Sequence, residues 1–307
     1  MKLQKQFVQS VRLYFQEQGE AWLEKLPELI EYCEQKWSMK LKEPYSLSVN
    51  YVAPAVMEDS TEVVVKICIP GEEFLDELEA LQLFGEKGSV QLIDSDHKNR
   101  IIILEKLSPG CTLAELTDDE EACWIAAKVI KNLSIKAPVQ TRIPTIKTRE
   151  ESLRKIVKEY PNGIGHISLQ TLQKALKIFT YLNETADKSF LLHGDFHHYN
   201  VLASGDMTWT AIDPKGLIGE IEYDLIQYML NKLPNQRAYE VIEKRVEIFT
   251  EELNLNKERL LLWGYCHTVL ATSWSVDDKD GSYSESFYQG IEIFKKLYEA
   301  NFGGLYY

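Results

Sequence analysis

The sequence lacks any long apolar run. None of its stretches approaches the 18 consecutive apolar residues that a membrane-spanning helix needs, so we expect no membrane partner. Residues 1–15 carry charged side chains throughout and no uninterrupted apolar core, which argues against a secretory signal. Both absences favour a cytoplasmic protein.

Cysteine is scarce and scattered. The chain has five cysteines, an odd number, and no two of them are spaced as C-x-x-C. This pattern excludes a disulfide framework and a cysteine zinc site, and it fits a reducing cytoplasm. The five are Cys33, Cys68, Cys111, Cys123 and Cys266.

Positive charge is in deficit. The 307 residues include 34 Lys and Arg against 47 Asp and Glu, which gives a formal net charge of −13. An acidic surface repels phosphate backbones, so nucleic acid is not an expected partner. A cationic small-molecule substrate would be attracted, although acidity also serves solubility alone.

The first third of the chain predicts a small sheet with helices. Apolar spacing predicts a helix over 5–35 that breaks at Pro27, and another over 72–84. Short β-branched runs predict three consecutive antiparallel strands and two further strands, at 45–49, 53–57, 62–69, 89–94 and 100–107. We therefore expect a first domain over residues 1–107.

The remainder, 108–307, is mostly helical in pattern and forms the second expected domain. Two β-like islands, the first made of 190–193 with 200–203 and the second of 208–213, flank a turn around Ser204–Gly205–Asp206, which predicts a hairpin. The expected fold class is α+β. Helical spacing covers 118–135, 149–160, 168–186, 239–253 and 257–276.

The stretch LLHGDFHHYN, residues 191–200, concentrates polar chemistry and has two readings. His193, Asp195, His197 and His198 are residue types that bind zinc. Their spacing matches no familiar zinc helix, since the chain has no HExxH, and adjacent residues on a strand point in opposite directions. Zinc is the weaker reading.

Phosphoryl transfer is the stronger reading. Such an enzyme needs a carboxylate for the hydroxyl proton and two oxygen ligands for magnesium. Asp195 and Asn200 are spaced as D-x-x-x-x-N, and Asp213 follows at the end of the second β-island. The hairpin would bring Asp213 back beside Asn200, and His193 would support the loop from behind.

The motif H-G-D-x-x-x-x-N followed by I-D-P resembles the aminoglycoside phosphotransferase family, relatives of the protein kinases. The stretch IDPKGLIGEIEYDL, 212–225, resembles the branch of streptomycin 6-phosphotransferases and hydroxyurea-resistance kinases. The resemblance extends over about 45–280 and is strongest at 191–225. It implies a protein-kinase-like fold of two lobes. The N-terminal lobe, which binds the nucleotide, has a five-stranded antiparallel sheet and a helix, and the C-terminal lobe is mainly helical, with catalytic and acceptor-binding roles. It also implies ATP and Mg²⁺ as cofactors.

The resemblance assigns roles in the first lobe. Lys66, late in the third strand, would contact the α and β phosphates, and a helical glutamate would hold it. Glu77 is the best match to that glutamate, with Glu73 and Glu79 as alternatives.

The strand IIILEKLSPG resembles the family's hinge. Glu105 and Leu107 would offer backbone groups to the adenine edge, with Leu104 at the back of the pocket.

One departure concerns the phosphate loop. The stretch SLSVNYVAPAVMEDS, 46–60, contains no glycine, whereas protein kinases cover the phosphates with a glycine-rich loop. Ser48 or Asn50 would donate to phosphate instead. The choice of ATP over GTP stays open here.

The acceptor side rests on 261–278, which resembles a late helix of the streptomycin-kinase branch. Trp274 would stack on a sugar that bears guanidinium groups, and Asp277 and Asp278 would pair with those groups. Lys215 either contacts phosphate or pairs with a neighbouring acid.

The leading hypothesis is an ATP-dependent O-phosphotransferase that acts on an aminoglycoside such as streptomycin, with Asp195 as the catalytic base. One alternative is a kinase for another small metabolite hydroxyl, such as a sugar, a choline-like alcohol or a hydroxyurea-type compound, since a fold does not fix its acceptor. A second is a non-catalytic nucleotide-binding kinase homologue.

Overall fold

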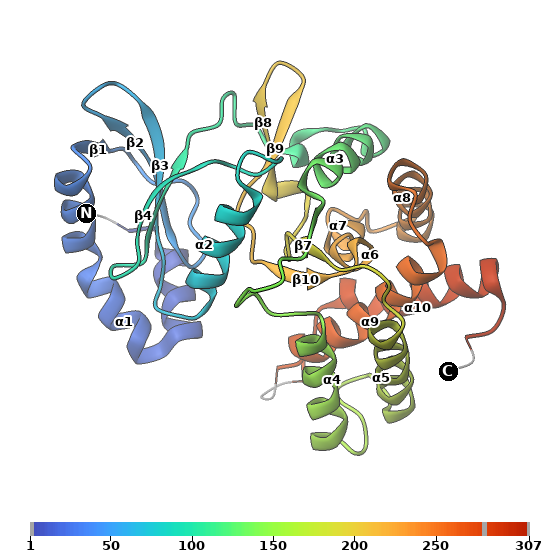
Figure 1. Ribbon diagram of the computed structural model, residues 1–307. Coiled ribbons are helices and arrows are strands. Elements are labelled where there is room, and N and C mark those ends of the chain that lie inside the picture. Colours follow the sequence, from blue (N-terminus) through green and yellow to red (C-terminus); the bar gives the residue numbers. More distant parts are fainter. Residues whose placement is uncertain (1–2, 278–280, 306–307) are drawn as a thin grey trace. The chain divides into compact units, whose positions relative to one another are not determined.

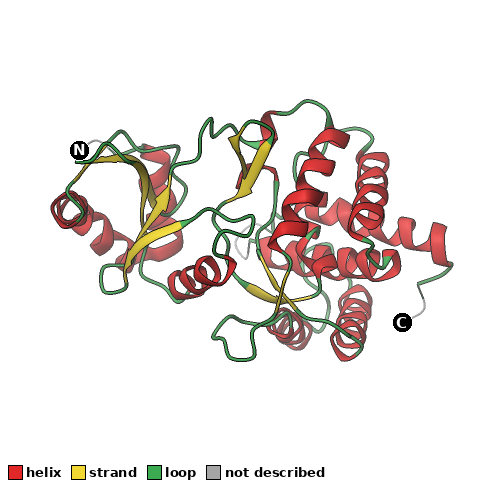
Figure 2. Ribbon diagram, turned by 45° about the horizontal axis from the view of Figure 1, so that its top comes forward, coloured by secondary structure: helices red, strands yellow, loops and turns green. Residues whose placement is uncertain are grey.

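The chain forms two compact units, described here by a computed structural model for residues 3–277 and 281–305 (Figure 1; Figure 2). The first unit contains 1–110 and 203–210, and the second contains 111–202 and 211–307. The division falls at Gly110, three residues after the expected 107. The segment 203–210 groups with the first unit because the N–H of Gly110 donates to the carbonyl of Ala203 at 3.0 Å.

The first unit is built on a five-stranded antiparallel sheet with strand order β1-β2-β3-β5-β4, as expected for the α+β fold. In β3, Lys66 pairs in register with Val52 and Ile102. Successive residues of a strand point to opposite faces, so Val65 packs in the core with α1 while Lys66 faces α2. The elements are α1 (Lys5–Lys36), β1 (Met39–Leu41), β2 (Tyr51–Met57), β3 (Glu62–Ile67), α2 (Glu73–Phe84), β4 (Leu92–Asp96) and β5 (Ile101–Glu105).

The predicted break of the first helix at Pro27 is wrong, because the kink lies at Gln16. That residue has φ 46° and ψ −126°, whereas Pro27 stays inside the helix. Burial of Leu26 and Leu29 against the sheet holds the helix through the proline. Gly19 is required beside the kink, since a Cβ there would lie 2.7 Å from the carbonyl oxygen of Val11.

The predicted first strand at 45–49 is also wrong. The strand is Met39–Leu41, and residues 42–50 form a loop. Its N–H groups at Lys42 and Tyr45 donate to the carbonyls of Pro54 and Val52 in β2, at 2.8 and 3.1 Å, but other backbone groups of the loop bond to a side chain. The Gln4 amide donates to the carbonyl of Tyr45 at 2.6 Å and accepts from the N–H of Leu47 at 3.1 Å. Backbone groups used in this way are not available to a sheet ladder.

The second unit surrounds one buried helix, α9. Its residues from Leu260 to Ser273 are all buried, and it packs against α5 and α10. Helix α10 was not predicted, although the spacing of Ile291, Phe294 and Leu297 is helical. The helices are α3 (Asp119–Leu133), α4 (Lys147–Glu159), α5 (Leu169–Glu184), α6 (Ile221–Asp224), α7 (Ile226–Leu230), α8 (Ala238–Leu253), α9 (Lys257–Ser275) and α10 (Glu285–Phe302).

Short strands lie before and after the polar loop in the chain: β6, β7 and β10 belong to the second unit, whereas most of β8 and β9 belongs to the first. A three-stranded sheet has the order β10-β7-β6, and β8 and β9 form the predicted hairpin. The strands are β6 (Ile135–Lys136), β7 (Phe190–Leu192), β8 (Val201–Gly205), β9 (Thr208–Ala211) and β10 (Leu217–Gly219), and two 3-10 turns lie at Leu113–Glu115 and His198–Asn200.

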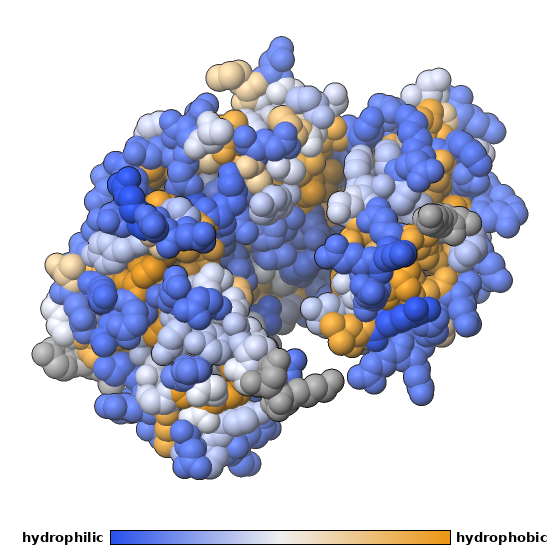
Figure 3. Space-filling view, turned by 180° about the vertical axis from the view of Figure 1, so that it is seen from behind, coloured by the Kyte–Doolittle hydropathy of each residue, from blue (hydrophilic) through white to orange (hydrophobic). Residues whose placement is uncertain are grey.

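The surface agrees with the charged composition. On the face drawn in Figure 3, hydrophilic residues predominate and hydrophobic ones lie in separate patches. Across the part of the chain that the structure describes, none of the helices combines the length and apolarity that a bilayer crossing requires.

Close packing of α9 on α10 generates a stability prediction. A Cβ on Gly264 would lie 2.3 Å from two ring carbons of Phe294. We expect Gly264→Ala to lower the free energy of unfolding by about 1–2 kcal/mol, because overpacking costs more than the helix propensity that alanine gains. Urea unfolding followed by circular dichroism measures the change.

Gly71→Ala is the matched control. A Cβ at Gly71 meets no atom within 4 Å, so its effect should stay within about 0.5 kcal/mol. Equal stability of the two variants would contradict the packing argument.

Candidate active site

The polar loop 193–200 is held by one buried carboxylate. Asp224, in α6, accepts the N–H of His193 through Oδ2 and the N–H of Gly194 through Oδ1, both at 2.8 Å. Gly194 has φ 83°, a conformation that glycine adopts without strain, and its N–H has no strand partner at this turn. Burial raises the pKa of Asp224 to about 6. Asp224 therefore fixes the backbone at the start of the loop.

His193 connects the polar loop to the end of the β8–β9 hairpin by a hydrogen bond to Ile212. Its ring Nε2 lies 2.9 Å from the carbonyl oxygen of Ile212, and its Nδ1 accepts the N–H of Asp195 at 3.3 Å. This arrangement needs the neutral ring with the proton on Nε2, and burial lowers the pKa of His193 to about 4. The carbonyl of His193 also accepts the N–H groups of Lys215 and Gly216 at 2.8 and 3.1 Å.

Asp195 and Asn200 are in direct contact. The Asn200 side-chain nitrogen donates to the carbonyl of Asp195 at 3.0 Å and lies 3.5 Å from its carboxylate. The nitrogen is thereby occupied, and the side-chain oxygen Oδ1 is the atom left for a cation. The Asp195 carboxylate is about one-third exposed, so a substrate hydroxyl has access to it.

Asp213 is placed near the polar loop by a backbone hydrogen bond of the preceding residue, Ile212. The N–H of Ile212 donates to the carbonyl of Asn200 at 2.9 Å, so the hairpin returns the chain to this residue as predicted. Asp213 has φ 59°, which aspartate and asparagine tolerate better than other side chains. Lys215 forms an ion pair with it, Nζ to Oδ2, at 2.9 Å. Of the two roles considered for Lys215, pairing with an acid is the one observed.

The donor set suits a hard divalent cation. Asn200 Oδ1 and the Asp213 carboxylate would offer two oxygen ligands, and magnesium commonly takes one or two protein oxygens and completes its shell with phosphates and waters. Within residues 3–277 and 281–305, no three His, Cys, Asp or Glu side chains form a metal-binding group. The zinc reading of His193, Asp195, His197 and His198 is therefore not supported.

The two remaining histidines differ sharply. His198 is buried and stacks on Tyr228, with ring centroids 3.9 Å apart, and burial lowers its pKa to about 3. His197 lies at the site: its Nε2 is 3.3 Å from the Asn200 side-chain nitrogen and 3.7 Å from the Asp195 carboxylate. Burial lowers the pKa of His197 as well.

In the first unit, Lys66 and Glu77 form a buried ion pair. Lys66 Nζ donates to both carboxylate oxygens of Glu77, at 2.6 and 2.7 Å, and both residues are about 5% exposed or less. Of the three glutamates considered, Glu73, Glu77 and Glu79, Glu77 is the one that these two bonds place against Lys66. The pair has the geometry that the resemblance implies, and its role stays a prediction.

Two residues predicted to contact the nucleotide, Glu105 of the hinge and Asn50 of the phosphate loop, form hydrogen bonds within the first unit. The N–H of Glu105 donates to the carbonyl of Gln91 at 3.0 Å, and its side chain accepts the N–H of Gln91 at 2.7 Å. Leu107 lies just after β5 and is half-buried. Asn50 accepts the N–H of Ile69 at 3.0 Å, so its side-chain oxygen braces the loop 42–50.

The residues predicted for the acceptor lie at the end of α9. Trp274 is 47% exposed, its N–H donates to Ser152 at 3.0 Å, and the guanidinium of Arg149 lies 5.4 Å from its ring centroid. A cation of the chain itself thus already lies over this ring. Asp277 is exposed, and its carbonyl accepts the N–H of Gly281 at 2.8 Å. Asp278 lies outside the described residues.

Sequence reasoning gave no role to two residues of this site. Asp224 belongs to the Tyr-Asp pair of the 212–225 motif, which was the available signal. His197 was considered only as a zinc ligand, with no role in phosphoryl transfer, and its contacts with Asp195 and Asn200 become visible only in the folded loop.

The fold is protein-kinase-like. It matches that of aminoglycoside phosphotransferase APH(4)-Ia, with TM-score 0.64, 13% identity, and coverage of 90% of this chain and 99% of that one. It also matches choline kinase LicA from Streptococcus pneumoniae, with TM-score 0.62, 14% identity, and coverage of 89% and 99%.

The sequence narrows the class to a family. Residues 41–279 match the family described as aminoglycoside/hydroxyurea antibiotic resistance kinase, and the chain belongs to it. It is 29% identical over 273 residues to streptomycin 6-kinase of Streptomyces griseus, which covers 85% of this chain and 87% of that one. It is 28% identical over 269 residues to hydroxyurea phosphotransferase of Kitasatospora aureofaciens, with coverage of 85% and 76%. The chain is therefore a small-molecule O-phosphotransferase, as predicted.

The raised pKa of Asp224 generates a prediction about pH. Its folded pKa of about 6 lies above its unfolded value near 3.9, so the folded state binds more protons between these pH values. The free energy of unfolding of the wild type, relative to Asp224→Asn, should therefore fall by about 1.4 kcal/mol as pH rises from 5 to 7.5. Urea unfolding of both proteins across this range measures the difference.

Asp206→Asn, which removes an exposed carboxylate at the hairpin turn, is the control and should follow the wild type at every pH. A constant difference between wild type and Asp224→Asn would show that Asp224 does not titrate in this range.

Proposed function

We propose that the chain transfers the γ-phosphate of ATP to a hydroxyl of an aminoglycoside, with streptomycin as the substrate to test first. The observation that carries this choice is the 29% identity to streptomycin 6-kinase over 85% of the chain. The net charge of −13 supports it, because an acidic protein attracts a sugar that bears guanidinium groups.

The proposed mechanism begins at Asp195. Its carboxylate accepts a hydrogen bond from the acceptor hydroxyl and orients the oxygen toward the γ-phosphate. It takes the proton as the new P–O bond forms and the bond between the γ-phosphorus and the bridging oxygen breaks, with ADP as the leaving group. The contact with Asn200 and the backbone bond to His193 hold the carboxylate in place. Positioning contributes most of the rate in phosphoryl transfer, since little covalent work is left to the protein.

The phosphates are held by cations. Lys66 binds the α and β phosphates. Its two bonds to Glu77 hold the lysine side chain in one rotamer, so the ammonium group stays in position. Asn200 Oδ1 and Asp213 would hold Mg²⁺, which supplies charge neutralisation at the phosphates when bound. Lys215 pairs with Asp213 at 2.9 Å, and it would add positive charge beside that carboxylate when Asp213 holds the metal.

A second candidate acceptor is the hydroxyl of hydroxyurea. The 28% identity to a hydroxyurea phosphotransferase over 85% of the chain favours it. Both acceptors leave the roles of Asp195, Asn200 and Asp213 unchanged, so the difference lies in the acceptor pocket.

Asp195→Asn tests the mechanism. We expect kcat to fall about 10²–10⁴-fold, the range of general-base contributions, while the KM for ATP changes little. Coupled-assay kinetics of ADP release measure both constants. Asp187→Asn, an exposed aspartate ahead of β7, should keep the wild-type kcat. Near-wild-type turnover by Asp195→Asn would remove Asp195 from the catalytic role.

An acceptor screen tests the substrate. Purified protein with ATP and Mg²⁺ is offered streptomycin, another aminoglycoside, hydroxyurea and choline, and products are read by mass spectrometry. We expect streptomycin to gain one phosphate with the highest kcat/KM. A higher value for hydroxyurea would favour the second candidate, and phosphorylation of choline alone would reject both.

A further inference from the structure

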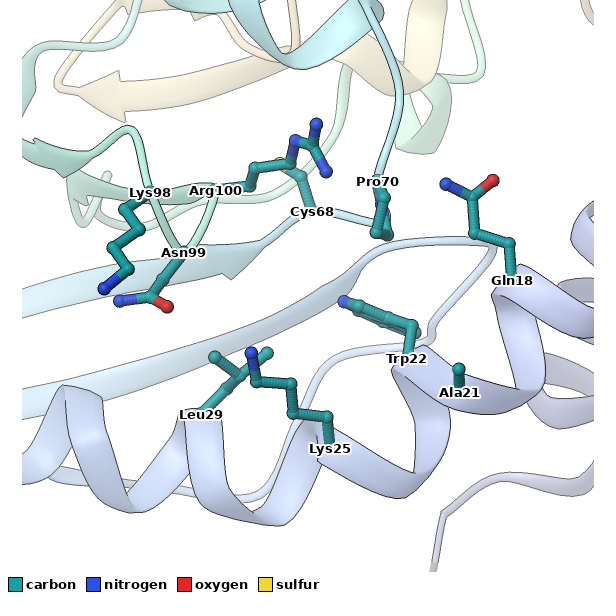
Figure 4. Close-up of a pocket in the computed structure, with 10 residues that line it drawn as sticks. All are labelled: Gln18, Ala21, Trp22, Lys25, Leu29, Cys68, Pro70, Lys98, Asn99 and Arg100. Carbon is teal, nitrogen blue, oxygen red and sulfur yellow. The ribbon is translucent and has the colours of Figure 1, made fainter.

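The first unit contains a cavity of about 250 Å³ that none of the assigned roles uses. It lies between α1, the segment that follows β3, and the turn that joins β4 to β5 (Figure 4). Its lining residues are Gln18, Ala21, Trp22, Lys25 and Leu29 from α1, Cys68 and Pro70 after β3, and Lys98, Asn99 and Arg100 from the turn.

The cavity concentrates positive charge in an acidic protein. Lys25, Lys98 and Arg100 line it, and none of these three cations forms an ion pair with any residue in the described ranges. The nearby carboxylate of Asp96 is already engaged by Lys36 at 2.9 Å and by Tyr32 at 2.6 Å. Three uncompensated cations around one cavity, in a chain of net charge −13, favour an anionic ligand.

A buried donor points the same way. Trp22 is only 4% exposed, and its indole N–H has no acceptor in the part of the chain that the structure describes. In Figure 4 the indole nitrogen of Trp22 and the ammonium of Lys25 both extend from α1 into the gap below the strands. Buried N–H groups nearly always have an acceptor, so an unused one in the wall of a cavity indicates where a ligand oxygen would bind.

The size and the remaining walls restrict the ligand. A volume of about 250 Å³ is roughly that of eight water molecules in the liquid and lies below the usual range for drug-sized ligands. Leu29, Pro70 and the face of Trp22 offer apolar surface beside the cations. The ligand is therefore a small molecule with one anionic group and a compact apolar part.

The cavity is separate from the residues assigned to the nucleotide. Trp22 and Leu29 belong to the core on the α1 face of the sheet together with Val65, whereas Lys66 points to the opposite face and pairs with Glu77. The cavity does touch Cys68 and Pro70, in the segment that joins the strand of Lys66 to the helix of Glu77. A ligand here would brace that segment.

From these observations we propose that the cavity is a second binding site, specific for a small organic anion whose phosphate or carboxylate group meets Trp22 Nε1 and the cations Lys25, Lys98 and Arg100.

Calorimetric titration with three small probes tests the proposal. Phenyl phosphate and benzoate carry the two kinds of anionic group on a compact apolar ring, and benzyl alcohol is a neutral analogue. Each is titrated into the full chain in the presence of a saturating non-hydrolysable ATP analogue with Mg²⁺. We expect one equivalent of phenyl phosphate or of benzoate to bind, and no heat from benzyl alcohol; the tighter of the two anions identifies the preferred group.

Variants locate the binding. Trp22→Phe keeps the ring but removes the N–H, and Lys25→Gln with Lys98→Gln removes two exposed cations without touching the core. Each should weaken the Kd of the preferred anion about tenfold or more, the usual effect of losing a hydrogen bond to a charged group. Lys87→Gln, an exposed lysine outside the cavity, should bind as the wild type does.

Failure of both anions to bind the wild type would overturn the proposal. Binding that is unaffected in the double lysine variant, or that is abolished by the ATP analogue, would also overturn it, since the anion would then lie elsewhere. None of these outcomes depends on which acceptor the enzyme phosphorylates.

Discussion

The polar loop 193–200 depends on the hydrogen bonds that the carboxylate of Asp224 accepts. The carboxylate accepts two successive backbone N–H groups, those of His193 and Gly194, at a turn where no strand can pair with them. The ring of His193 then bonds to the carbonyl of Ile212, whose N–H bonds to Asn200. One buried acid thus sets the positions of both candidate metal ligands through the backbone. Burial disfavours the charged form of Asp224. An aspartate is nevertheless suited to this turn, because no neutral side chain accepts two N–H bonds equally well.

The buried ion pair of Lys66 and Glu77 likewise fixes a side chain in place at a cost in folding free energy. Removing two charges from water is unfavourable, and their attraction in the interior compensates only in part. Two short bonds from one ammonium to both oxygens of Glu77 fix the lysine to the first turns of α2. The value of the pair therefore lies in geometry. A lysine that reached a phosphate from an exposed position would lose side-chain entropy each time a nucleotide bound.

How far the sequence predicts this protein depends on how local each signal is. The sequence could predict that Asp195, Asn200 and Asp213 lie on one loop and the hairpin after it, because these elements follow directly along the chain; the roles of the three residues stay predictions. The strand at 39–41 could not be predicted, since three residues are too few to show alternation. Nor could the kink at Gln16, beside which Val11 and Phe15 approach Gly19 closely. The role of Asp224 could not be predicted, because its partners are backbone groups about thirty residues away in the sequence, which no side-chain pattern reveals. Helix α10 was missed although its apolar spacing is regular.

The division of the first unit into two chain segments has a consequence for biosynthesis. Residues 1–110 leave the ribosome well before 203–210, which belong to the same compact unit. At ordinary elongation rates the intervening delay is about 5–20 s. During that interval Gly110 lacks the Ala203 carbonyl that later accepts its N–H. The first unit is therefore completed only after most of the loop that carries Asp195 has been made, so the order of translation links the maturation of the two halves of the enzyme.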